Sequence, residues 1–150
     1  MSECVLCRLA RGEARCHQIW EDAKHVAFLS GHPNTEGFSV VVTKEHYPSY
    51  AFDLPDPVLS DLILAAKRVA KLLDSKLADV GRTALIFEGF GVDHVHAKLF
   101  PMHGTKFDEW RPVRSQVRKY FERYEGYVSS HEGEQADDAK LARLAELIRD

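Results

Sequence analysis

Residues 93–101 of the chain read Asp-His-Val-His-Ala-Lys-Leu-Phe-Pro, with a polar side chain at alternate positions. Successive side chains of a β-strand point to opposite faces, so a strand here would place His94, His96 and Lys98 in one row. A neutral imidazole is a nucleophile and a metal ligand, and an ammonium group attracts phosphate. The row therefore predicts a site that handles phosphate, with an incidental polar strand edge as the alternative.

The elements that must position this row are mostly strands. Apolar and β-branched runs bounded by turn residues predict strands over 18–21, 25–29, 38–43 and 83–87. The last of these is separated from the histidine strand by a short turn around Gly89 and Gly91, which favours antiparallel pairing of the two. The other face of the histidine strand is apolar and suits a core: Val95, Ala97 and Leu99.

Apolar residues at helical spacing predict two longer helices. Asp56 can cap the first, with Pro57 in its first turn, and Asp137 or Asp138 can cap the last. The predicted buried stripe of the first helix is Leu59, Leu62, Ile63, Ala66, Val69, Ala70 and Leu73. The predicted stripe of the last helix is Leu141, Leu144, Ala145 and Ile148.

Three further segments complete the expected architecture. Residues 4–12 predict a short turn or helix closed by glycine, 113–124 a partly helical segment, and 126–132 an edge strand. Strands dominate the middle of the chain, with one long helix between them and another at the end. This order indicates an α+β fold with a mainly antiparallel sheet.

Composition limits the classes of partner. The 150 residues suit a single domain, 1–150, with 45% hydrophobic and 29% charged residues and a net charge of -3. This charge gives no reason to expect nucleic acid or a membrane surface as a partner, and no apolar run approaches the ~20 residues of a membrane span. The first residues lack the pattern of a secretory signal, and three cysteines suit a reducing cytoplasm, so we expect a cytoplasmic protein.

A metal site is a second candidate. Cys4 and Cys7 have the C-x₂-C spacing that lets two thiolates bind one tetrahedral zinc, although two small buried residues would look the same. Two further ligands are needed. The neighbouring pair Cys16 and His17 could supply them, or His46 after the central strand together with the first histidine of the row; spacing does not choose between these sets.

These residues together resemble the histidine-triad (HIT) family of nucleotidyl hydrolases and transferases. Its signature, His-φ-His-φ-His-φ-φ with φ apolar, matches residues 94–101 except at the third histidine, which is Lys98. The Cys4-x-x-Cys7 start, the Trp20-Glu21-Asp22 segment and the stretch 37–46, which ends in His46, are similar to further family motifs and occur in family order.

The resemblance implies a fold and a reaction. The fold would be a five-stranded antiparallel sheet with a long central helix and a C-terminal helix, commonly paired into a homodimer with a continuous ten-stranded sheet. His96 would attack the α-phosphorus of a nucleotide and form a nucleotidyl-histidine, which water or another acceptor then resolves. The substrates would be dinucleoside polyphosphates or nucleoside phosphoramidates.

The resemblance also implies roles for other residues. In zinc-carrying branches of the family the matching positions bind a structural zinc ion, and here they are Cys4, Cys7, His46 and His94. Cys16 falls outside this set and is interpreted as a small interior residue. Leu6, Leu9 and Phe28 match apolar positions that sandwich the nucleobase, with plain core packing as the alternative.

Lys98 is the main departure from the family pattern. A lysine supplies a positive charge and donors to phosphate oxygens, but no acceptor. His103, just past the strand, could supply a displaced imidazole to the phosphate, although a surface loop histidine is the other interpretation. Three hypotheses follow: a nucleotide hydrolase or transferase working through His96 and Lys98, a non-catalytic nucleotide-binding module, or a zinc-stabilised interaction protein.

Overall fold

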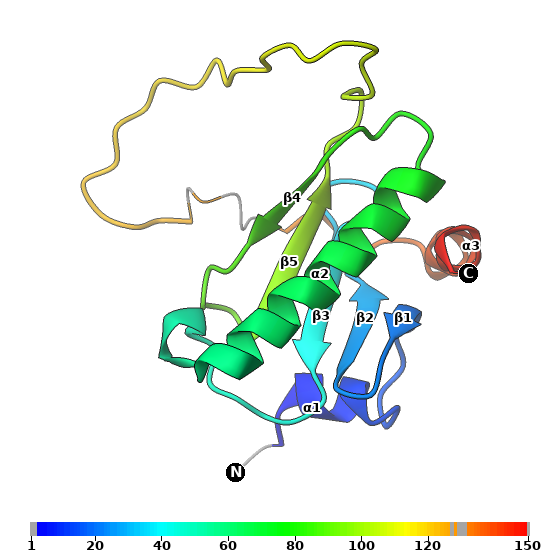
Figure 1. The fold of residues 1–150 in the computed structure, drawn as a ribbon, viewed down its shortest axis with the longest axis vertical. Helices are drawn as coiled ribbons and strands as arrows, with labels where there is room; N and C mark the ends of the chain where they lie inside the picture. Colours follow the sequence, from blue (N-terminus) through cyan, green and yellow to red (C-terminus); the bar gives the residue numbers. More distant parts are fainter. Residues whose placement is uncertain (1–2, 127, 129–131, 150) are drawn as a thin grey trace.

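Five antiparallel strands form one sheet in the order β1-β2-β3-β5-β4 (Figure 1). The computed structural model describes residues 3–126, 128 and 132–149. The strands are β1 (His17–Glu21), β2 (His25–Leu29), β3 (Ser39–Thr43), β4 (Thr83–Ile86) and β5 (His96–Pro101). The helices are α1 (Val5–Ala10), α2 (Asp56–Lys76) and α3 (Asp138–Ile148), with a 3₁₀ turn at Ala51–Asp53. This arrangement confirms the α+β fold and the five-stranded sheet expected from the sequence.

One face of the sheet is covered by α2, which crosses the strands as Figure 1 shows. The apolar residues of the histidine strand point to this side, and Val95, Ala97 and Leu99 are buried in the same core cluster as the helix. Helix α3 lies beside β1 and adds Ala145 and Ile148 to this core. Alternation along β5 therefore leaves His96 and Lys98 on the opposite face, as the strand pattern predicts.

Helix α2 differs from the sequence prediction at its start and in its stripe. The N-cap is Pro55 and no side chain caps the helix, so the prediction of Asp56 as the cap was wrong, while Pro57 does lie in the first turn. Ile63 is 41% exposed, because one residue of helix turns it about 100° away from buried Leu62. Ala65 is buried instead, one position N-terminal to the predicted Ala66.

Helix α1 packs on the other face of the sheet. Its Leu6 forms a second apolar cluster with Val26 and Phe28 of β2 and Val42 of β3. The helix ends as predicted at a glycine, since Gly12 has a φ of +73°, a conformation that glycine adopts without a steric penalty. The cluster and the side chains of His96 and Lys98 therefore lie on one side of the sheet.

The last third of the chain contains one helix. Asp137 caps α3 by accepting a 2.9 Å hydrogen bond from the backbone N–H of Lys140. The prediction of partly helical structure over 113–124 was wrong: this segment has no regular structure and runs away from the sheet (Figure 1). Most of its apolar residues are exposed, as Val113 and Val117 illustrate, so a helix there would have little apolar face to bury.

The predicted edge strand over 126–132 lies mostly outside the described residues. Those of its residues that the structure describes, 126, 128 and 132, belong to no strand. Among residues 3–126, 128 and 132–149, no helix is long and apolar enough to cross a membrane.

Candidate functional site

His96 is the first residue of β5 and pairs with Val42 of β3. Its Nδ1 lies 2.6 Å from the backbone carbonyl oxygen of His94, and because a carbonyl only accepts, Nδ1 must donate the proton. Burial lowers the pKa of His96, and the nearby Lys98 ammonium lowers it further. The carbonyl of His94 and the carboxylate of Glu88 act in the opposite direction, but the net shift is downward. The lowered pKa favours the neutral imidazole, which is partly exposed and, with the proton on Nδ1, carries its free electron pair on Nε2.

Lys98 faces the same side as His96 and forms an ion pair that the sequence analysis missed. Its Nζ lies 3.2 Å from Oε1 of Glu88, and only 13% of the lysine and 7% of the glutamate side chain are exposed. Glu88 follows β4, whose Ile86 pairs with Lys98 across the hairpin. The signal for this pair was the predicted antiparallel hairpin, which places residues shortly before the glycine turn opposite residues of the histidine strand.

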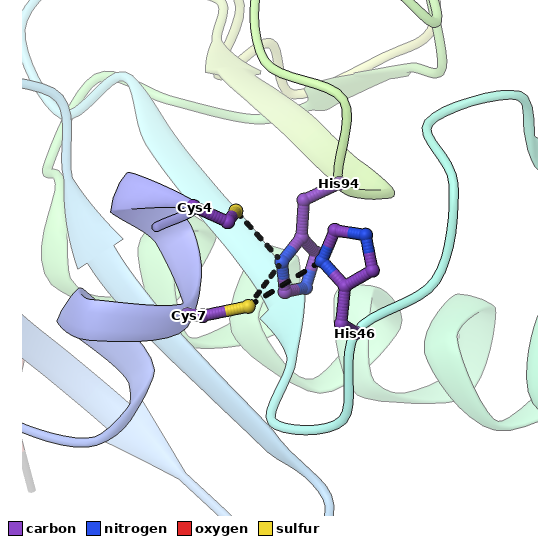
Figure 2. A group of neighbouring side chains, drawn as sticks. All are labelled: Cys4, Cys7, His46 and His94. Atoms are coloured by element: carbon purple, nitrogen blue, oxygen red, sulfur yellow. Dashed lines mark hydrogen bonds between the residues drawn. The ribbon is translucent and has the colours of Figure 1, made fainter. Parts of the chain in front are cut away.

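Four sulfur and nitrogen ligands meet at the end of the sheet where β3 finishes and β5 begins (Figure 2). Cys4 and Cys7 come from the start of α1, His46 from the loop after β3, and His94 from the residue pair that leads into β5. Their ligand atoms all lie within 4.8 Å of one another, although the residues are up to 90 positions apart in the sequence. The structure thus brings together the set that the family resemblance implied.

The geometry of these four residues fits zinc. The Nδ1 of His94 lies 3.5 Å from Sγ of Cys4 and 3.4 Å from Sγ of Cys7, and the Nδ1 of His46 lies 3.4 Å from Sγ of Cys7. A tetrahedral zinc site with ordinary bond lengths has sulfur–nitrogen edges of about 3.6 Å. A buried metal ligand also needs the correct tautomer, and the Nε2 of His94 donates to the carbonyl oxygen of Thr43 at 2.9 Å, which leaves the Nδ1 electron pair facing the thiols.

The alternative ligand pair does not join this cluster. The Nε2 of His17 lies 2.8 Å from Asp138 at the start of α3. Cys16 packs beside the apolar cluster of Leu6 and Phe28, and burial raises the pKa of its thiol. Both residues therefore have local roles at β1, an edge strand of the sheet.

The remaining candidate residues fall into two groups. Leu6 and Phe28 are buried in the second cluster, with Leu9 partly buried against it, on the face that carries His96. His103 is not brought to that site, because it lies beyond the far end of β5. Its Nδ1 lies 3.0 Å from Asp79 and its Nε2 2.7 Å from the carbonyl oxygen of Glu36, and since both partners only accept, both ring nitrogens are occupied as donors.

Comparison with known proteins agrees with this geometry. A family model described as the HIT domain matches residues 11–105. The chain is 31% identical to the adenosine 5'-monophosphoramidase hnt1 of Schizosaccharomyces pombe over 108 residues, which cover 69% of this chain and 77% of that protein. The chain belongs to the HIT domain family. A HIT-like protein of Methanocaldococcus jannaschii is 30% identical over 107 residues, covering 67% of this chain and 79% of that one.

Solved structures of HIT proteins share the fold. A zinc-bound histidine triad family protein from Mycobacterium smegmatis superimposes with a TM-score of 0.69 at 18% identity, over 98% of this chain and 91% of that one. A histidine triad nucleotide-binding protein from Sulfolobus tokodaii gives a TM-score of 0.72 at 19% identity, over 97% and 89% of the two chains. The HIT fold expected from the sequence is confirmed.

Proposed function

We propose that this HIT protein is a nucleotide hydrolase or transferase that acts at an α-phosphate through a nucleotidyl-histidine on His96. The observation that carries the proposal is the state of that imidazole. Its Nδ1–H is held by the carbonyl of His94, its Nε2 keeps the electron pair, and it stands outside the cluster of metal ligands. A neutral imidazole fixed on a rigid strand beside a cation has what in-line attack on phosphorus needs.

The reaction would proceed in two displacements. The Nε2 electron pair of His96 attacks the α-phosphorus, and the bond from phosphorus to the leaving group breaks with its electron pair going to that group. Water then attacks the phosphorus, the bond to Nε2 breaks, and the imidazole regains its electron pair. One difficult displacement thereby becomes two easier ones.

Lys98 would stand where the family has its third histidine. Its ammonium, mostly buried, can donate hydrogen bonds to the phosphate oxygens and stabilise the charge that develops on them. A nucleoside monophosphate amide suits the pair, because the leaving nitrogen needs a proton and an ammonium group can donate it. The family includes relatives named adenosine 5'-monophosphoramidase in yeasts and an adenylylsulfatase in Arabidopsis thaliana.

The nucleobase would lie against Leu6, Leu9 and Phe28. Leu9 is partly exposed over buried Leu6 and Phe28 on the same face as His96, and a purine ring gains by covering the apolar area that remains in water there. His103 takes no part in this proposal, since both of its ring nitrogens are already paired.

The ligand set Cys4, Cys7, His46 and His94 would hold a structural zinc ion. Zinc bound there would be coordinated by four protein ligands and would stabilise the junction of α1 with the start of β5. We also propose that the chain is a single domain that forms a homodimer in the cytoplasm, as the family resemblance and the three free cysteines suggest.

The proposal is tested by mass spectrometry of the protein after brief exposure to an adenosine phosphoramidate. We expect an added adenylyl group on a peptide that contains His96, and release of AMP on longer incubation. His96→Ala should lose both signals while keeping the thermal midpoint of the wild type. AMP release that survives in His96→Ala would refute the mechanism, and tight AMP binding without turnover in the wild type would support a non-catalytic module instead.

A further inference from the structure

Glu88 carries a buried carboxylate oxygen without a partner. Its side chain is 7% exposed and Oε1 pairs with Lys98, but Oε2 is buried with no hydrogen-bond partner among the described residues. A buried acceptor left unpaired costs free energy, so native structures retain very few of them unless a ligand or water completes the pairing. The chemistry of a carboxylate requires that the missing partner be a hydrogen-bond donor.

The order of groups across the sheet shows which part of a substrate would reach Glu88. The apolar cluster of Leu6 and Phe28 lies over β2 and β3, His96 stands on β5, and Glu88 follows β4 at the edge of the sheet. Lys98 follows His96 by two positions on the same face of β5, and its Nζ lies 3.2 Å from Oε1 of Glu88, so the carboxylate stands on the His96 side of the sheet. His96 stands between the apolar cluster and the Lys98–Glu88 pair, so a nucleotide with its base on the cluster and its α-phosphorus at His96 has this pair on the side of the phosphorus away from the base.

We infer that Glu88 selects substrates whose leaving group is an amine on phosphorus, which donates a hydrogen bond to Oε2, over substrates whose leaving group is an anion. This inference rests on the proposed function. An N–H donor supplies the partner that Oε2 lacks, whereas a phosphate or sulfate leaving group offers only acceptors. Such an anion would also meet a buried negative charge, and like charges repel more strongly where water is excluded.

The amine reaction balances on the residues that the site holds. As Nε2 of His96 bonds to phosphorus, the P–N bond breaks, its electron pair goes to nitrogen, and nitrogen takes a proton from the Lys98 ammonium. The proton moves between two amine nitrogens, from a positioned general acid to the leaving group. In the second step water attacks phosphorus and gives a proton back to Lys98, so that the products are a nucleoside monophosphate and the free amine.

The Lys98–Glu88 pair explains why the carboxylate is kept beside a phosphate site. In the free protein Glu88 accepts a hydrogen bond from the Lys98 ammonium through Oε1, and the buried Oε2 has no partner among the described residues. An attacking imidazole, a proton donor and an acceptor for the leaving amine then follow one another across β5 and β4.

The test compares two substrates that differ only beyond the α-phosphate. One is an adenosine 5'-phosphoramidate of a simple alkylamine, and the other is diadenosine tetraphosphate. Glu88→Gln keeps the shape of the side chain and removes its charge. We expect kcat/KM for the phosphoramidate to fall about 10- to 100-fold, the loss of a charge-assisted hydrogen bond in the transition state. The value for diadenosine tetraphosphate should stay unchanged or rise, so the ratio of the two should fall at least about tenfold.

Two further variants distinguish an effect on substrate preference from an effect on the fold. Glu88→Asp keeps the charge and should retain the preference for the phosphoramidate even if both rates drop. Glu109→Gln removes an exposed carboxylate from a loop and should leave both values as in the wild type. The thermal midpoint and the metal content of each variant show whether it has the native fold.

The possible outcomes distinguish this inference from the proposed function. Equal losses on both substrates in Glu88→Gln would overturn the role of Glu88 in selection, because a merely structural residue affects both alike. Loss of the preference in Glu88→Asp would overturn it as well. A wild type that neither releases AMP nor forms an adduct on His96 would refute the proposed function itself.

Discussion

Replacing His46 by alanine isolates what a metal ion contributes to this fold. The side chain is exposed, unlike Cys7 and His94, so in the metal-free protein its loss should change the free energy of unfolding by less than about 0.5 kcal/mol. In the metal-loaded protein it removes one of four ligands. A large difference in the free energy of unfolding between the variant and the wild type therefore comes from metal binding and not from the packing of the histidine.

The size of the effect follows from binding linkage. At a free zinc concentration about 1,000 times the dissociation constant, binding to the folded state alone stabilises it by about 4 kcal/mol. For a chain of this length each kcal/mol corresponds to roughly 2–4 °C in the thermal midpoint, so loss of the metal should lower it by about 8–16 °C. The four ligands join the start of α1 to the residues just before β5. Loss of the metal would therefore remove this link between the two segments.

The assay combines elemental analysis with thermal unfolding. Wild-type protein should contain one zinc per chain and lose stability on treatment with a strong chelator. His46→Ala should contain much less zinc and respond little to the chelator. Cys16→Ala is the matched control, because this cysteine lies outside the cluster, and it should keep the wild-type zinc content. A full zinc content in His46→Ala, or its loss in Cys16→Ala, would refute the ligand assignment.

Two predictions concern stability away from the site. The carbonyl of Glu36 and the carboxylate of Asp79 raise the pKa of His103, so its contribution is present below about pH 6.5 and is lost as the pH rises through the raised value. His103→Gln should thus lower the free energy of unfolding by about 0.5–1 kcal/mol at pH 6, a figure reduced for solvent screening, and by less at pH 8.5. The measurement is urea unfolding at each pH. Equal losses at pH 6 and pH 8.5 would contradict this prediction. Leu62→Ala, at a fully buried position of α2, should lower the free energy of unfolding by about 2–5 kcal/mol in the same assay. Ile63→Ala, at a half-exposed position of the same helix, should lower it clearly less. Comparable losses in the two variants would contradict the observed buried stripe.

The strands were predictable because their signal is local. Each of the five contains β-branched or apolar residues between turn residues, and β2 over 25–29 has the predicted bounds. The alternation along β5 also placed Ala97 and Leu99 in the core before any contact was known. The stripe of α2 was predicted only in part, because Ile63 and Ala65 both fit an apolar face and only packing against the sheet decides which is buried.

The site depended on contacts that sequence spacing does not encode. The Cys4–Cys7 pair predicted a metal, but spacing did not choose between His17 and His46. The family resemblance implied His46, and the fold brings together this set, whose members lie up to 90 positions apart. Glu88 was missed because a glutamate before a glycine turn reads as a surface residue, whereas pairing of β4 with β5 turns it toward Lys98. His103 was expected to supply an imidazole to the phosphate, which requires it to lie near His96. The two residues lie at opposite ends of β5, so the strand keeps them apart.

The 90 positions between Cys4 and His94 set an order of events during synthesis. Ribosomes add about 5–20 residues per second, so the first thiol waits roughly 5–18 s before its imidazole partner exists, and longer before that partner leaves the exit tunnel. Throughout this interval two nascent thiols are open to oxidation or to mispairing with other cysteines. Zinc capture would then be a late step of biogenesis, and a cell short of the metal or under oxidative stress would accumulate chains whose first helix never docks.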